Sequence, residues 1–114
     1  MKRILLTLLI VCFATFAYAG DSAISSGEQA ADALIFDGSA LITALQVVTD
    51  GTNDGKLIVY DNTSAAGTVI NEFTVTGASH YGGRVFIPPI EAQTGIYCDI
   101  SGTGATYFVE YARD

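Results

Sequence analysis

Hydrophobic and polar positions alternate with a period of two through most of the chain after residue 33. The clearest runs are residues 41–48, 69–76, 96–100 and 107–111, and residues 56–60 add a strand-like run of β-branched and aromatic type. Such alternation is typical of half-buried β-strands, and no long stretch has the 3.6-residue period of an amphipathic helix. Gly, Asn, Asp or Pro residues separate the runs, most densely at 50–55 and 61–67. The pattern therefore predicts that residues 33–114 form an all-β, antiparallel β-sandwich of seven to eight short strands, jelly-roll or immunoglobulin-like.

Two runs carry expectations about individual strands. In residues 41–48 both alternating faces are fairly apolar, with Leu41 expected on the same face as Leu45 and Val47. This composition suits a central strand that is covered on one side and partly covered on the other. Residues 77–83 are expected to form a loop, and residues 84–87 a strand that Pro88 and Pro89 stop.

The first nineteen residues have the layout of a secretory signal peptide, expected to be helical. Lys2 and Arg3 precede an apolar run at residues 4–16, and Ala17–Tyr18–Ala19 supplies a cleavage site before Gly20. The apolar run is shorter than the ~20 residues of a spanning helix. A retained membrane anchor is the alternative. A lipoprotein would use Cys12, but Val11 stands where a small residue is required.

We therefore expect an exported protein, located in the periplasm, on the cell surface or outside the cell. After removal of the leader we expect no stable membrane insertion. Residues 20–32 are small and polar and are expected to form a mobile N-terminal arm or an edge strand. A mobile arm could dock on the sheet edge of a neighbouring molecule.

The charge after the leader is strongly negative. Residues 20–114 hold all twelve acidic residues and only three basic ones, a net charge of −9. This balance argues against nucleic acid and anionic membranes as partners, because both need clustered Lys and Arg. Cys98 is the only cysteine after the leader, so no intramolecular disulfide is expected. Its phase with Ile96 and Ile100 predicts a buried thiol.

One acidic loop has the spacing of a calcium site. Asp50, Thr52, Asp54, Gly55 and Asp61 match positions one, three, five, six and twelve of an EF-hand-like pattern. However, residues 56–60 read as a strand of roughly 17 Å, which would separate Asp61 from Asp50. We therefore expect a hairpin loop and no metal or other cofactor. A weak Ca²⁺ site made by the loop alone is the alternative.

Catalytic chemistry has little support in the sequence. Ser79 and His80 are adjacent and would point in opposite directions in an extended loop, so they are poor partners for nucleophilic catalysis. We expect no catalytic residues. The tyrosines are expected to serve in sheet packing, with Tyr97 facing outward, although they could form a sugar-stacking platform. These residues are Tyr60, Tyr81, Tyr97, Tyr107 and Tyr111.

Three stretches of the chain are similar to a known group of proteins. They are Ile24–Glu28 through Ala33–Phe36, Asp50–Gly55 through Tyr60–Thr63, and Gly95–Tyr97 through Ser101–Tyr107. The pattern of strand and turn residues in these stretches resembles that of small β-sandwich proteins encoded among the virion structural genes of tailed bacteriophages and prophages. The resemblance implies a β-sandwich with a structural role. The leader departs from it, because virion proteins assembled in the cytoplasm do not normally carry a secretion signal.

The expected function is that of a non-enzymatic exported structural module. It would be a subunit of a virion-like or cell-surface assembly, with a second copy or another protein subunit as its partner. A secreted carbohydrate-binding or adhesive domain, with surface carbohydrate as its partner, is the alternative. An exposed apolar edge strand or an ordered N-terminal arm would favour the first function. A cluster of exposed aromatic residues would favour the second.

Overall fold

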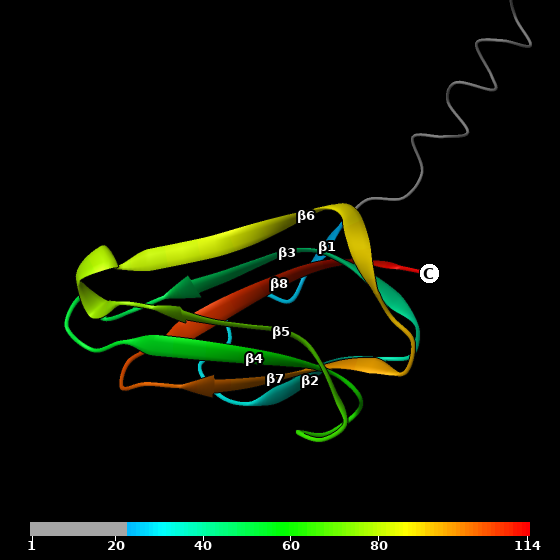
Figure 1. Ribbon diagram of the computed structural model, residues 1–114, viewed down its shortest axis with the longest axis horizontal. Helices are drawn as coiled ribbons and strands as arrows, with labels where there is room; N and C mark the ends of the chain where they lie inside the picture. Colours follow the sequence, from blue (N-terminus) through cyan, green and yellow to red (C-terminus); the bar gives the residue numbers. More distant parts are fainter. Residues whose placement is uncertain (1–22) are drawn as a thin grey trace, which may run out of the picture.

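The computed structural model describes residues 23–114, so the expected leader and its cleavage site lie outside the described residues. The described chain forms two antiparallel four-stranded sheets that face each other, which confirms the all-β sandwich (Figure 1). Sheet A has the order β1-β8-β3-β6, and sheet B has the order β2-β7-β4-β5. The strands are β1 (Ile24–Ser25), β2 (Ala33–Asp37), β3 (Ala40–Val48), β4 (Gly55–Asp61), β5 (Thr68–Val75), β6 (Tyr81–Ala92), β7 (Gly95–Ser101) and β8 (Thr106–Arg113).

The strand pairings are nested. β1 pairs with β8, β2 with β7, β3 with β6 and β4 with β5. The pairs alternate between the two sheets, as if one long hairpin had been folded over itself. The β3–β8 and β4–β7 pairs then join neighbouring hairpins within each sheet. The chain therefore crosses repeatedly between the sheets, and the inner faces of the two sheets enclose one common core.

The core lies between the inner faces of the two sheets. Its largest fully buried side chain is that of Tyr107, whose hydroxyl donates a 2.9 Å hydrogen bond to the Ala31 carbonyl. That bond satisfies the one polar group of the ring, as burial requires. The other members of the core are Ala40, Ile42, Leu45, Val47, Leu57, Val59, Val75, Ala92, Ile96, Cys98, Val109 and Tyr111.

A β-bulge in β3 corrects the expected alternation of residues 41–48. The register of β3 shifts between Ile42 and Ala44 against both of its neighbours. Ile42 and Leu45 are both buried in the core, whereas Leu41 is only partly buried. The prediction that Leu41 shares a face with Leu45 is therefore wrong. The extra residue of a bulge moves every later side chain to the opposite face, which a strict period of two does not allow for.

β6 also differs from the expectation. The predicted loop at residues 77–83 contains a short 3-10 turn, Gly77–Ser79, and β6 already begins at Tyr81. The strand then runs through Pro88 and Pro89, where it was expected to stop. Val85 pairs with Ala44 and Ile90 with Ile42, so the residues between Val85 and Ile90 bulge opposite Thr43. Proline fits there because a bulge on an edge strand needs no ladder N–H from these residues. Figure 1 shows the sharp bend that results in β6.

Residues 23–32 are tied to the sandwich by backbone and side-chain hydrogen bonds. β1 pairs with β8, and the Ser26 N–H donates to the Val109 carbonyl at 2.8 Å. Gln29 forms an antiparallel bridge with Tyr107. Asp32 Oδ1 then accepts a 2.8 Å hydrogen bond from the Ile100 N–H in sheet B. Of the two expectations for the arm, the described part has the geometry of an edge strand that crosses from sheet A to sheet B.

Candidate functional site

The most exposed apolar side chains lie on β6. Among the described residues, β6 is the edge of sheet A opposite β1, with β3 as its only ladder neighbour. Tyr81 is 65% exposed, Val85 is 73% exposed and Ile87 is 90% exposed. We call this group, together with Gly83, the β6 surface. A long apolar edge strand is unusual in a monomeric protein because its free backbone groups and side chains invite pairing with another chain.

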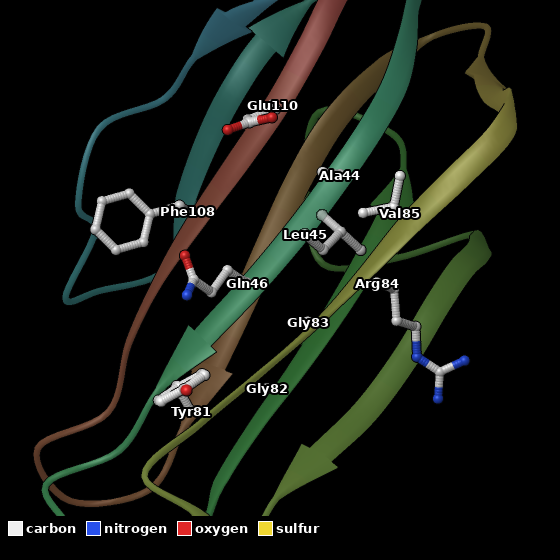
Figure 2. A pocket seen from close by; sticks show the side chains of 10 residues that line it. All are labelled: Ala44, Leu45, Gln46, Tyr81, Gly82, Gly83, Arg84, Val85, Phe108 and Glu110. Atoms are coloured by element: carbon white, nitrogen blue, oxygen red, sulfur yellow. The ribbon is translucent and has the colours of Figure 1, made fainter.

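A shallow hollow of about 370 Å³ adjoins the β6 surface on the outer face of sheet A. Tyr81 and Phe108 are its aromatic lining, and Gln46 and Glu110 are polar residues of the same lining. Gly83 pairs with Gln46, which pairs in turn with Phe108. Because Gly83 has no side chain, nothing projects from β6 at its end of this cross-strand row, which leaves room for the hollow (Figure 2). The arrangement can receive a flat, partly apolar group.

Gly83 and its neighbour Gly82 allow β6 to lie close to the rest of the sandwich. A Cβ atom on Gly83 would lie 2.7 Å from the Leu45 carbonyl oxygen, and one on Gly82 would lie 2.8 Å from a methyl group of Val75. Both distances are shorter than real contacts allow. Arg84 reaches across from β6 to sheet B, where its guanidinium carbon lies 5.3 Å from the centre of the Phe73 ring. This cation–π contact holds the two sheets together at this side.

The start of β6 is held by residues of the β3–β4 loop. Asp54 Oδ1 accepts a 2.9 Å hydrogen bond from the Gly77 N–H. The buried Thr49 hydroxyl lies 3.2 Å from the carbonyl oxygens of both Gly77 and His80. A Cβ on Gly77 would lie 2.4 Å from the Thr52 backbone, so only glycine permits this approach. These contacts fix the turn from which Tyr81 emerges.

The end of β6 is held by Asp61. Its carboxylate accepts hydrogen bonds from the N–H groups of Gln93 and Thr94 at 3.1 Å and 2.8 Å, and a longer one from Gly95. Partial burial raises the pKa of Asp61, but the three N–H donors outweigh it and the net shift is downward. The carboxylate is thus stabilised in its charged form at the β6–β7 turn.

The residues with EF-hand-like spacing do not converge on one point. β4 separates Asp61 from the loop that contains Asp50 and Asp54, as the strand expected at 56–60 implies. Asp50 accepts hydrogen bonds from the backbone N–H groups of Asn53 and Thr52, which lower its pKa. Within residues 23–114, no three His, Cys, Asp or Glu side chains are grouped as metal ligands would be. The hydrogen bonds show these aspartates acting as loop supports.

The side chains of Ser79 and His80 are not joined by a hydrogen bond. The Ser79 hydroxyl bonds with the Thr76 hydroxyl at 2.7 Å. His80 is exposed and has a φ of 70°, in the left-handed region. Its carbonyl oxygen accepts a 2.7 Å hydrogen bond from the Thr49 N–H, which begins the β3–β6 ladder. The structure gives this pair a role in the turn.

The tyrosines are divided among three locations. Tyr107 and Tyr111 are buried in the core, so a platform of all five tyrosines does not exist. Tyr60 and Tyr97 are paired across β4 and β7, and both are partly exposed, so Tyr97 faces outward as predicted. Tyr81 lies on sheet A at the β6 surface. One sequence signal could have located the β6 surface. Tyr81, Val85 and Ile87 are large apolar residues at alternate positions just before two prolines, which are typical of an edge strand.

The prediction that Cys98 is buried is confirmed. The side chain is 0% exposed and lies between Ala33 and Val59 in sheet B. Burial raises the pKa of the thiol to about 12. At neutral pH the thiol therefore stays protonated, which makes it a poor nucleophile.

The described residues include no helix of the length and apolarity needed to span a bilayer. Comparison with protein families, with curated proteins and with solved structures finds no match to this chain.

Proposed function

We propose that this protein is a non-enzymatic structural module, exported from the cell, that serves as a subunit of a virion-like or cell-surface assembly. The observation that carries the proposal is the β6 surface. β6 is a twelve-residue edge strand that presents Tyr81, Val85 and Ile87 to solvent. Hydrogen bonds hold both of its ends, so the strand is presented in a defined shape. A pre-shaped edge loses little entropy when another chain adds to it.

Among β-sandwich folds, the jelly roll suits this role. The nested order of 1-8-3-6 in one sheet and 2-7-4-5 in the other is the arrangement expected for eight strands folded as one double-layered hairpin. An immunoglobulin-like sandwich divides its strands differently between the two sheets. Jelly rolls occur in viral capsid proteins and lectins. The capsid use agrees with the resemblance to virion proteins, and the lectin use agrees with the alternative of carbohydrate binding.

The test is the size of the particle that contains the protein in its native source. A subunit is expected to sediment in assemblies many times larger than the 12.0 kDa chain. The double variant Val85→Lys/Ile87→Lys should move into the monomer fraction, because burying two ammonium groups at an interface is costly. The matched control is Val69→Lys on β5, one of the two edge strands of sheet B, where Val69 is 46% exposed. Wild-type protein that is monomeric in every fraction would contradict the proposal.

Carbohydrate binding is a second candidate, and the hollow beside β6 favours it. Tyr81 and Phe108 can stack on sugar rings, and Gln46 and Glu110 can bond sugar hydroxyls. Affinity electrophoresis in polysaccharide gels tests this function. Tyr81→Ala and Phe108→Ala should each weaken binding about tenfold, whereas Tyr60→Ala on sheet B should not. Equal effects of all three variants, or no retardation of the wild type by any polysaccharide, would contradict it.

A further inference from the structure

We infer that two copies of this chain pair through their β6 strands, antiparallel and centred on Gly83, so that Tyr81 of each copy lies opposite Val85 of the other. The inference rests on the proposed structural function and names the partner and the register. The two sheets A would then form one continuous sheet across a two-fold axis.

The backbone of β6 has the right polarity for this register. Residues Tyr81–Val85 pair with β3 without a bulge. The Thr49 N–H donates to the His80 carbonyl, so this pair is hydrogen-bonded. Because antiparallel pairs alternate, Gly82 and Arg84 are the next β6 residues bonded toward β3. The N–H and C=O groups of Tyr81, Gly83 and Val85 are therefore directed to the open edge.

Centring on Gly83 uses all three of these residues. Gly83 meets Gly83 of the second copy, and Tyr81 meets Val85 twice, on the outer face of the sheet. An aromatic residue opposite a β-branched one is a favourable cross-strand pair. Centring on Tyr81 would instead bring Ser79, in the 3-10 turn, opposite Gly83. Centring on Val85 would require Ile87, which lies in the bulge, to pair with Gly83.

Charge also favours a second copy at this edge. Residues 20–114 carry a net charge of −9, so most approaches of two copies are repulsive. From Tyr81 to Ile90 the strand has no acidic residue and only Arg84 as a charged one. In the proposed register Arg84 lies opposite Gly82, so the two guanidinium groups are not directly opposed. Added salt screens the remaining repulsion and should increase the dimer fraction.

Disulfide trapping tests the register on the purified chain carrying Cys12→Ser, which removes the thiol of the leader. Tyr81→Cys and Val85→Cys variants are mixed in equal amounts under mild oxidation. In the proposed dimer their Cα atoms lie about 5.5 Å apart, within the range that a disulfide spans. Two copies of the same variant place their thiols roughly 14 Å apart along the strands, which is too far. The mixture should therefore form linked dimers at least about tenfold faster than either variant alone.

Val69→Cys, on one of the two edge strands of sheet B, is the control for nonspecific oxidation when mixed with Val85→Cys. Cys98 is fully buried in every variant and should not contribute. Light scattering of the wild-type chain should also show a dimer that increases with salt and that Val85→Lys abolishes. Cross-linking at equal rates in all mixtures, or a wild-type monomer at every salt concentration, would overturn the inference. The structural function would survive if the protein still sedimented in large assemblies from its native source, since another subunit could then occupy β6.

Discussion

At the scale of single residues, the aspartates whose spacing suggests a calcium site form hydrogen bonds that hold turns. Asp54 and Asp61 accept backbone hydrogen bonds at opposite ends of β6, and Asp50 caps its own loop. A carboxylate that accepts several N–H bonds satisfies donors that the turn would otherwise leave unpaired. Asp50, Asp54 and Asp61 thus supply acceptors to backbone N–H groups in the turns.

The pH dependence of Asp61 provides a test of this role. Its pKa is lowered on folding, so its contribution to stability is complete above the unfolded value near 4 and is lost as pH falls through the folded value. Asp61→Asn should lower the free energy of unfolding by about 1 kcal/mol at pH 7, and the difference should approach zero at low pH. Denaturant unfolding across pH measures it.

Asp99→Asn is the control for this pH series. Partial burial and the neighbouring Asp32 carboxylate raise the pKa of Asp99, so removing its charge should not lower stability at pH 7. A difference between wild type and Asp61→Asn that stays constant from pH 7 to the acid limit would contradict the assignment to the charged carboxylate.

Cys98 offers a second test at this scale. Because the thiol is fully buried and its pKa is raised to about 12, a thiol reagent should label the native protein slowly and the denatured protein quickly. Cys98→Ala should lower the free energy of unfolding by about 1 kcal/mol through lost packing. Mass spectrometry of quenched samples follows the labelling. Rapid stoichiometric labelling under native conditions would show that the sheets open at this position.

At the scale of elements, one end of the sandwich depends on loops that pack against each other. The β7–β8 turn approaches the β3–β4 loop so closely that a Cβ on Gly102 would lie 2.0 Å from the Asp54 carbonyl oxygen. Asp54 in turn holds Gly77 before β6. Turns that are far apart in sequence thus fix the position of the β6 surface together.

Replacing Gly102 should therefore disturb more than its own turn. Gly102 has a φ of +111° in addition to the close contact, so Gly102→Ala should cost at least about 3 kcal/mol. Gly27→Ala is the matched control, because Gly27 has a φ of +71° but nothing within 4 Å of the added atom. Only the conformational cost of about 1–2 kcal/mol applies there. Equal losses in thermal unfolding would show that the contact with Asp54 is unimportant.

At the scale of the whole molecule, residues 23–32 join the two sheets. They pair with β8 in sheet A, accept the Tyr107 hydroxyl bond, and cap Ile100 in sheet B through Asp32. The stability of the sandwich should then depend on a segment that has only Ile24 as a large apolar residue. Its contribution comes mainly from satisfying buried and edge backbone groups.

Removal of this segment gives a direct measure of the contribution. A chain that begins at Ala33 should melt at least about 8 °C below one that begins at Gly20, because it loses several hydrogen bonds of about 1 kcal/mol each. Calorimetry of both chains, with light scattering to compare their masses, is the measurement. Equal melting temperatures would mean that the segment is dispensable. A lower mass in the shorter chain alone would assign self-association to this segment in place of β6.

The sequence alone predicted the strand pattern, the sandwich, the burial of Cys98 and the outward direction of Tyr97. These features depend on local alternation and on turn residues, which each segment encodes for itself. The phase of β3 after Thr43 and the course of β6 through its prolines were missed, because both follow from bulges. A bulge is decided by how two strands fit each other, and neither strand alone records it.

Only the tertiary structure determined which strands are neighbours and hence where the exposed surface lies. Tyr81 and Val85 lie on the outer face of sheet A, and this face together with the edge position of β6 leaves them and Ile87 in solvent. The nested pairing brings Asp54 and Asp61 to the two ends of that strand from outside it. Long-range pairings depend on the free energy of the whole packed core, whereas the local pattern specifies only which face of each strand is apolar.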